Sequence, residues 1–362
     1  MAWLVLEDGK AFAGEEIGFW PAAYPPRGGE VVFNTSSSGY QEMITDLAYA
    51  GQILTFTHPQ IGNYGWHREE NEAGKILLKG LIVRELSAGE GSFHADGSLE
   101  DYCRKHKIAG LKGVDTRALT RYLAKYGYRL GVLVKERGAG ERFWQEHPPE
   151  VFRPARPLVY QAGTAEEYLI PGSGPVLALL DLGVKRNLLR CLQQRGYCLY
   201  VLPAGTPAEE ILALKPQGLV ISNGPGAPTE LPEIAAQISK VFSRLPILGI
   251  GLGHQLIALA AGGETYQLLC GHRGNYPVQS SLTGRATMTT QNHGYAVRRD
   301  TLRGTGLQVL YTNLNDGTVE GLSHQKYNIL AVEFYPEGAP GPENEAVFTR
   351  FDQMVRGRAV HA

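Results

Sequence analysis

The sequence predicts an α/β protein of two domains. Its 362 residues exceed what one ordinary hydrophobic core organises, so two domains are expected. From residue 176 onward, short apolar runs alternate with segments of helical periodicity, which is typical of a parallel sheet covered by helices on both faces. Residues 1–135 contain short β-branched and aromatic runs between turns, and these predict an N-terminal mixed α/β domain.

In the N-terminal domain, the composition predicts strands at residues 3–6, 30–34, 52–57 and 79–84. One helix is predicted after Asp115, and Gly127 supplies its stop signal. Four apolar residues of this helix fall on one face: Leu119, Tyr122, Leu123 and Tyr126. This domain therefore needs both strands and helices to build its core.

Prolines and glycines gather in residues 136–173 and interrupt regular structure there. The segment ends in the sequence Pro-Gly-Ser-Gly-Pro at residues 171–175. We place the domain boundary at this point. The prediction is an N-terminal domain at 1–173, with a linker from about residue 136, and a C-terminal domain at 174–362.

The C-terminal domain shows continuous apolar strands at residues 176–181, 198–202, 218–222 and 246–250. Helices are predicted at 185–195, from about 208, at 234–242 and at 256–261, and residues 329–334 are again strand-like. Ligands of such sheets bind at the carboxyl ends of the strands. The loops after residues 222 and 250 should both lie at that edge.

Composition excludes several classes of function. The 35 basic and 36 acidic residues leave a formal net charge of −1, which gives no electrostatic reason for binding nucleic acid or a membrane. The four cysteines form no paired motif, so neither a disulfide framework nor a zinc site is expected, and a reducing compartment is the default. Without a signal-peptide pattern or an apolar run of about 18 residues, we expect a cytoplasmic protein.

Two glycine-rich loops follow the third and fourth strands of the C-terminal domain. The first carries Gly224 and Gly226, which allow backbone to approach a ligand, although a tight turn explains them equally well. The second has Gly251 at its apex, between a strand and a helix, where several α/β hydrolytic enzymes hold their nucleophile. Its glycine spacing does not fit a dinucleotide fingerprint. This turn has the framework of a catalytic site without the reacting side chain.

Three polar segments complete the set of motifs. They are the hydroxyl-rich residues 34–42, the segment 291–295 with its histidine, and residues 335–337 after the last strand-like run. Taken alone, each has an ordinary structural explanation as a cap, a structural histidine or a charged strand end.

Taken together, the order and spacing of these motifs resemble the small, glutamine-hydrolysing subunit of carbamoyl-phosphate synthase, over nearly the whole chain. The N-terminal domain resembles that family through residues 4–9, 32–42 and 115–120, which separate it from other class I glutamine amidotransferases. The C-terminal domain resembles those amidotransferases through residues 222–226, 252–255 and 291–294, and the resemblance implies a flavodoxin-like fold.

The resemblance also implies partners and a role. The family hydrolyses glutamine to supply ammonia for carbamoyl phosphate in pyrimidine and arginine synthesis. It assembles with a large subunit, where ATP and Mg are expected to bind. No cofactor and no metal are expected in this chain.

The family's site residues carry over by position. Its catalytic triad falls on Gly251, Tyr335 and Glu337. Its glutamine pocket falls on eight residues: Ser36, Gly224, Gly226, Leu252, Gln255, Asn292, Gly294 and Tyr295.

Several departures from the family pattern bear on the chemistry. Gly251 stands where the family has its nucleophilic cysteine, and Tyr335 stands where it has histidine. Ala227 replaces the usual aspartate, and the segment 271–277 is one residue short. Glycine offers no nucleophile, and tyrosine, with a reference pKa of about 10, is a weak base at neutral pH. Loss of a triad nucleophile costs about 10⁶ in turnover.

Three hypotheses follow for the function of the chain. The first is a small-subunit-like component of carbamoyl-phosphate synthase that acts structurally or as a regulator, without glutaminase activity. The second is a glutamine-binding sensor that does not hydrolyse its ligand. The third is an active glutaminase that uses an unforeseen nucleophile, of which Cys270 is the nearest downstream candidate.

Overall fold

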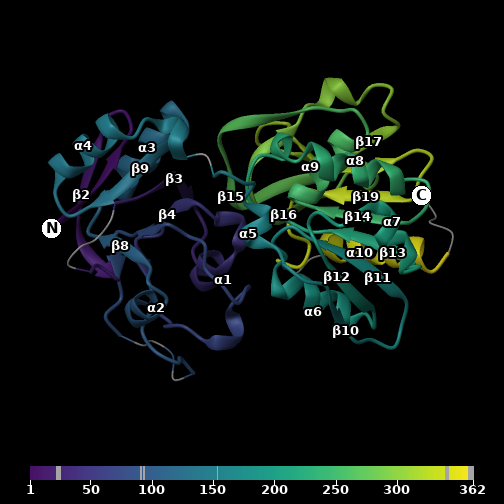
Figure 1. Ribbon diagram of the computed structural model, residues 1–362, viewed down its shortest axis with the longest axis horizontal. Coiled ribbons are helices and arrows are strands. Elements are labelled where there is room, and N and C mark those ends of the chain that lie inside the picture. The colour runs from purple at the N-terminus through teal and green to yellow at the C-terminus, as the bar shows by residue number, and fades with distance from the viewer. Residues whose placement is uncertain (22–25, 90–91, 93, 153, 339–341, 358–362) are drawn as a thin grey trace. The chain divides into compact units, whose positions relative to one another are not determined.

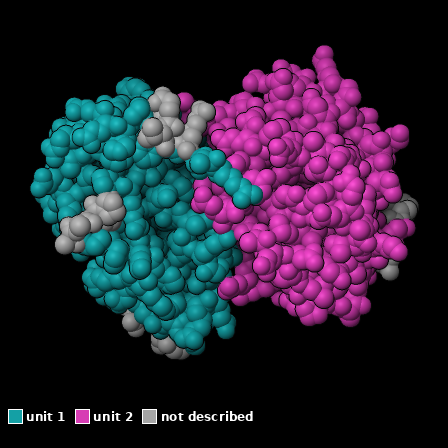
Figure 2. All heavy atoms as spheres, in the orientation of Figure 1, with its two compact units in different colours: residues 1–156 teal, residues 157–362 magenta. Residues whose placement is uncertain are grey.

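The chain forms two compact units, which a computed structural model describes at residues 1–21, 26–89, 92, 94–152, 154–338 and 342–357 (Figure 1). Unit 1 is Met1–Arg156 and unit 2 is Pro157–Ala362 (Figure 2). The division lies inside the predicted linker at 136–173 rather than at its end. The cause is β10 (Tyr168–Ile170), which pairs antiparallel with β12 (Cys198–Pro203) and so joins the preceding segment to unit 2.

Unit 1 is built on a closed β-barrel, which the strand predictions did not anticipate. In barrel order its strands are β1 (Ala2–Leu6), β2 (Ala11–Gly18), β8 (Ala109–Lys112), β6 (Gly80–Ile82), β4 (Gln52–Phe56), β3 (Arg27–Asn34) and β9 (Arg129–Val134). The four predicted strands coincide with β1, β3, β4 and β6. Leu4, Ile53 and Leu133 are fully buried members of one hydrophobic cluster, and closure leaves the barrel without an unpaired edge.

Helices and short elements surround this barrel. They are α1 (Tyr40–Thr45), η1 (Leu47–Tyr49), β5 (Gln60–Ile61), η2 (Arg68–Glu70), β7 (Glu85–Leu86), α2 (Leu99–Lys105), α3 (Thr116–Tyr126), α4 (Arg137–Glu146) and η3 (Pro149–Phe152). The helix predicted after Asp115 is α3, and the Asp115 side chain caps it by accepting a hydrogen bond from the Ala118 amide at 2.9 Å. Of its predicted apolar face, Leu119 and Leu123 are buried but Tyr126 is exposed.

The prediction that residues 136–173 lack regular structure is wrong for α4. The indole Nε1 of Trp144 donates to the Val5 carbonyl at 3.0 Å, which ties the helix to β1. Gly140 allows the close approach, since a Cβ at this position would lie 2.5 Å from a Val5 methyl group. Tertiary packing therefore overrides two glycines inside the helix.

Unit 2 is built on a ten-stranded mixed sheet with a parallel centre. Its order is β10, β12, β11 (Val176–Asp181), β13 (Gly218–Ile221), β14 (Ile247–Ile250), β19 (Ile329–Val332), β18 (Val319–His324), β16 (Ala286–Val297), β15 (Thr265–Ser280) and β17 (Leu307–Asn313). The five strands from β12 to β19 run parallel, as the apolar runs predicted. The antiparallel extension from β18 to β17 was not predicted.

Helices cover both faces of this sheet. One face packs against α7 (Ala208–Ala213), α8 (Pro232–Val241) and α9 (Leu252–Ala260), and the other against α6 (Arg186–Gln194) and α10 (Pro342–Val355). Consecutive strand residues alternate between the two clusters, as Leu219 and Val220 do, so both faces must be apolar. The remaining elements of unit 2 are α5 (Val159–Ala162), η4 (Pro228–Glu230) and η5 (Arg299–Leu302).

This arrangement places the predicted loops as expected. The loop at Gly224 follows β13, and the turn at Gly251 follows β14, at the carboxyl ends of neighbouring parallel strands. Helix α9 begins at Leu252, earlier than the predicted residue 256, because Gly251 is itself the N-cap residue. Among helices of the described residues, none has the length and apolar content that a membrane span requires.

Candidate active site

The Gly251 turn (residues 249–253) joins β14 directly to α9. Gly251 has φ 55° and ψ −112°, a conformation that glycine adopts readily and that strains residues with a Cβ. Its amide donates to the Val332 carbonyl at 2.9 Å, which holds the apex at the end of β19. A Cβ at this position would meet the Asn223 Cβ at 3.4 Å, which is ordinary contact. The turn keeps the shape and the space for a side chain but has none.

The loop after β13 runs beside this turn and is fixed by its own hydrogen bonds. The Ser222 hydroxyl accepts from the Leu182 amide at 2.9 Å and donates to the Asn223 carbonyl at 2.8 Å. Gly224 lies so close to the neighbouring chain that a Cβ would be 2.4 Å from the Leu182 oxygen. Gly226 has φ 93°, which favours glycine. These two predicted pocket residues form a rigid backbone loop at the sheet edge.

A second group of predicted pocket residues lies where α9 meets β16. The Gln255 amide Nε2 donates to the Tyr295 carbonyl at 3.2 Å and to Glu333 Oε1 at 2.7 Å. Leu252 and Gln255 are buried on α9, while Asn292, Gly294 and Tyr295 are half-buried on β16. The side chain of Gln255 thus links α9 to β16 and to Glu333, the residue that follows β19.

The other two triad positions follow β19 at the same edge. The Tyr335 amide donates to the Thr290 carbonyl at 2.9 Å, and its ring is 2% exposed. The Lys185 ammonium lies 4.6 Å from the centre of that ring. The backbone carbonyl of Glu337 accepts from the Asn187 side chain at 2.9 Å. A buried phenol thus occupies the position where the family pattern places an imidazole.

Ser36 is the predicted pocket residue that belongs to unit 1. It follows β3, and its amide donates to Asn34 Oδ1 at 2.7 Å, which forms a turn closed by the asparagine side chain. The side-chain Nδ2 of Asn34 in turn donates to the Tyr49 hydroxyl at 2.9 Å. The other seven predicted pocket residues lie in unit 2, on the elements described above.

A buried acid–histidine pair, which sequence reasoning missed, connects the helix after the Gly251 turn to the residue after β19. His254 Nδ1 lies 2.7 Å from Glu333 Oε2, and both side chains are fully buried. Burial raises the pKa of Glu333 and lowers the pKa of His254, so both shifts favour the neutral forms. A glutamate inside the apolar run 329–334 was the available signal. The pair ties α9 to the end of β19, and with it the backbone of the turn.

The parallel sheet and its strand-to-helix turn indicate the class of protein. Residues 178–354, which contain both, match the family model "Glutamine amidotransferase class-I". Residues 4–133 match the family model "Carbamoyl-phosphate synthase small chain, CPSase domain". Together the two models account for both units of the fold.

Curated relatives extend the match to nearly the full length. A carbamoyl phosphate synthase small chain of Listeria monocytogenes serotype 4b (strain F2365) is 43% identical over 98% of this chain and 97% of its own. That of Symbiobacterium thermophilum is 44% identical over 98% and 99%. A pyrimidine-specific small chain of Lactiplantibacillus plantarum is 41% identical over 99% and 97%. The chain belongs to the carbamoyl-phosphate synthase small chain family, as the motifs predicted.

Proposed function

We propose that this chain is a carbamoyl-phosphate synthase small chain that assembles with a large subunit and does not hydrolyse glutamine by the family's thiol route. The observation that carries this proposal is Gly251 at the apex of the turn between β14 and α9. Amide hydrolysis by that route needs a thiolate at this point and a base to move its proton. Gly251 has no side chain to attack the amide.

The second triad position supports the same conclusion. Tyr335 is buried against Lys185, and a phenol does not carry the neutral imidazole nitrogen that accepts a thiol proton. Since nucleophile and base act as a unit, losing both costs little more than losing one, about 10⁶ in turnover. Glu337 alone does not restore the route.

Cys270 is a poor substitute nucleophile. Its thiol lies on β15, and burial raises its pKa above the ordinary value, which disfavours the reactive thiolate. Its backbone carbonyl accepts from the Arg273 side chain at 3.1 Å. The hypothesis of an active glutaminase through an unforeseen nucleophile therefore gains no support from this thiol.

The rest of the framework supports a structural or regulatory role. The turn keeps its shape because glycine tolerates its backbone angles and the pair His254–Glu333 anchors α9. In such an assembly, ammonia would come from solution, and ATP and Mg would bind to the large subunit. A cytoplasmic location and carbamoyl phosphate destined for pyrimidine or arginine synthesis are parts of the same proposal.

Two measurements test this proposal. The purified full chain, alone and with the large subunit of its source, is assayed for ammonia and glutamate released from glutamine. We expect no release above the rate without protein, together with co-purification of the two chains. Glutamine hydrolysis by the unaltered chain, abolished by a change at Gly251, would overturn the loss of activity. Failure of the chains to associate would overturn the subunit role.

A glutamine sensor is the second candidate, and the loop after β13 favours it. Gly224 keeps the close approach and Gly226 the positive φ of a fixed loop, and a Cβ at Gly251 would make only ordinary contacts. Isothermal calorimetry with glutamine and with glutamate as control tests this candidate. Selective heat from glutamine supports it, and its absence at about millimolar ligand, where a binding energy of about 4 kcal/mol still registers, removes it.

A further inference from the structure

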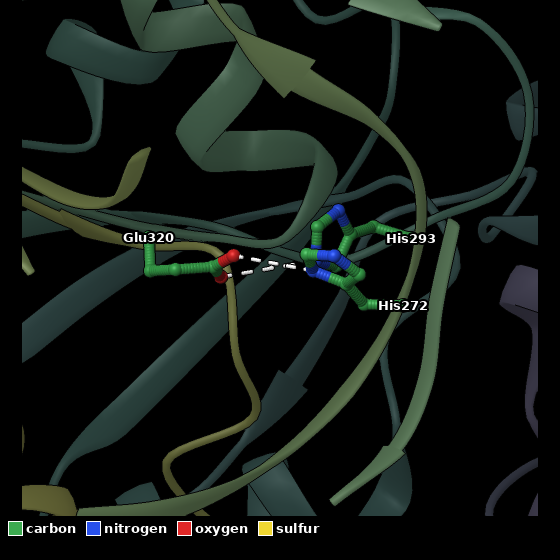
Figure 3. Close-up of side chains that lie close together, drawn as sticks. All are labelled: His272, His293 and Glu320. Carbon is green, nitrogen blue, oxygen red and sulfur yellow. Dashed lines mark ion pairs between the residues drawn. The ribbon is translucent and has the colours of Figure 1, made fainter. Parts of the chain in front are cut away.

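Two histidines and a glutamate, none of them a predicted triad or pocket residue, converge inside unit 2. His272 lies on β15, His293 on β16 and Glu320 on β18, and Figure 3 shows their side chains directed toward one another. All three are buried, and one ligand atom from each lies within 4.8 Å of the others. The antiparallel extension of the sheet is what brings these three strands together.

The outer nitrogen of each histidine is fixed by an acceptor. His293 Nδ1 lies 2.8 Å from the Tyr295 carbonyl, and His272 Nε2 lies 2.9 Å from Asp316 Oδ2. A carbonyl only accepts, so His293 Nδ1 carries hydrogen. The Asp316 carboxylate also acts as an acceptor, since its Oδ1 accepts from the Thr318 amide at 3.1 Å, so His272 Nε2 carries hydrogen as well. In their neutral forms, both histidines thus turn a lone pair inward, as metal-binding histidines do.

The side-chain amide oxygen of Gln291 lies close to the inward-facing nitrogens of both histidines. The Thr289 hydroxyl donates to the Tyr276 carbonyl at 2.9 Å, so its oxygen accepts from Gln291 Nε2 at 3.1 Å. The hydrogen bond from Nε2 fixes the orientation of the Gln291 amide and therefore the position of its oxygen Oε1. Gln291 Oε1 lies 3.1 Å from His272 Nδ1 and 3.1 Å from His293 Nε2.

Glu320 supplies the fourth inward-facing group. Its Oε1 lies 3.3 Å from His272 Nδ1 and its Oε2 lies 3.7 Å from His293 Nε2. Oε1 also accepts from Thr318 and Asn313, at 2.8 and 3.3 Å. Oε2 is buried and accepts no hydrogen bond from the described residues. A buried carboxylate oxygen without a partner is unfavourable unless a cation or proton meets it.

The four printed separations between a histidine nitrogen and an oxygen are close to those of tetrahedral metal coordination. Zinc binds nitrogen and oxygen at about 2.0–2.2 Å, which places adjacent ligands roughly 3.3–3.4 Å apart. The four separations above run from 3.1 to 3.7 Å.

We propose that unit 2 binds a structural zinc ion through His272 Nδ1, His293 Nε2, the Glu320 carboxylate and Gln291 Oε1. Nitrogen and oxygen ligands of this kind suit zinc better than calcium or magnesium. The four protein ligands leave no open position for substrate, which is the mark of a structural site. The ion cross-links β15, β16 and β18 and thereby steadies β16, which carries Asn292 and Tyr295.

The first test measures metal in the unaltered chain. The full chain, without an affinity tag, is purified from zinc-containing medium and analysed by elemental mass spectrometry. We expect one zinc per chain, a lower melting temperature after chelation, and recovery with zinc but not with magnesium. Cobalt substituted for zinc should give the visible absorption of a tetrahedral site. A folded chain without zinc, and without a response to zinc or cobalt, overturns the proposal.

Variants then assign the ligands. Glu320→Gln keeps the shape of the side chain but removes its charge, and it should abolish stoichiometric zinc. Asp316→Asn should weaken zinc affinity by about 10- to 100-fold, because it acts on His272 from outside the site. His324→Gln is the matched control, since it removes an imidazole from the same strand, β18, and should keep zinc. Full zinc in folded Glu320→Gln would overturn the assignment, and the cobalt spectrum tests the site even if that variant does not fold.

Discussion

Restoring the two missing triad groups is the sharpest test of the proposed loss of glutaminase activity. The change is Gly251→Cys together with Tyr335→His. The turn has room for the Cβ of a cysteine, because a Cβ at residue 251 would meet Asn223 Cβ at 3.4 Å, an ordinary contact. We expect the double variant to hydrolyse glutamine, whereas each single variant stays inactive because nucleophile and base act as a unit.

The stability cost of this repair can be worked out from the structure. A side chain at φ 55° costs about 1–3 kcal/mol of backbone strain. Tyr335 is buried, so a smaller imidazole leaves part of its volume unfilled, at a further cost of about 1–3 kcal/mol. The sum of about 2–6 kcal/mol lies below or near the lower part of the usual range of 5–15 kcal/mol for unfolding. The double variant should fold, with a lower melting temperature.

The assay measures ammonia and glutamate formed from glutamine by the full chain, alone and with the large subunit. Gly251→Ala with Tyr335→His is the matched control, since it carries the same Cβ strain and the same cavity but no thiol. The ceiling for the gain is about 10⁶-fold over this control. We expect a fraction of that ceiling, because Ala227 and the shortened segment 271–277 also differ from the family pattern.

Two results would refute the reasoning. If the unaltered chain releases ammonia as fast as the double variant, the thiol is not what the chain lacks. If the double variant folds, as circular dichroism would show, but is no faster than its control, the degeneration extends beyond the triad. In that case the residues Gly224, Gly226 and Gln255 no longer form a usable glutamine pocket.

Three further predictions concern stability and reactivity. Gly224→Ala would place a Cβ 2.4 Å from the Leu182 oxygen, so we expect it to lower the free energy of unfolding by about 1–3 kcal/mol in a denaturant titration. Burial raises the pKa of Cys103 to about 12, so its thiol should resist alkylation at pH 8 until the chain unfolds; labelling of the folded chain detected by mass spectrometry would contradict this. Although burial favours the neutral form, hydrogen bonds and the Arg129 charge lower the pKa of Asp8. Its stabilisation is therefore present above the unfolded pKa of 3.8 and lost as pH falls through the lower folded value, and the difference in melting temperature between Asp8→Asn and the unaltered chain should shrink in acid.

Local sequence patterns predicted much of the fold. The parallel strands of unit 2 are continuous apolar runs because both faces of the sheet are covered, and this signal survives without any tertiary information. Asp115 and Gly127 marked both ends of α3, since caps and stops depend on nearest neighbours. The helix α4 was missed for the opposite reason, because its contact with Val5 comes from a strand far away in the sequence.

The candidate site likewise contains residues that short motifs identify and residues that only the tertiary structure brings together. Gly251 and Tyr335 could be identified by their place in short motifs, and the structure locates both at the carboxyl edge of the parallel strands. The pair His254–Glu333 gave only a weak signal, a charged residue within an apolar strand. Its partners are 79 positions apart, and only strand pairing and helix packing decide that they touch.

The sequence by itself determined the family, the two-domain organisation, the alternating strands and helices of unit 2, and the absence of a thiol at the turn. These depend on residue identity, spacing and local periodicity. Only the tertiary structure decided that unit 1 closes into a barrel and that His272, His293 and Glu320 share one buried site, where the sequence predicted no metal. The physical reason is that strand register and sheet order set which distant side chains meet, and each strand's own composition does not encode its neighbours.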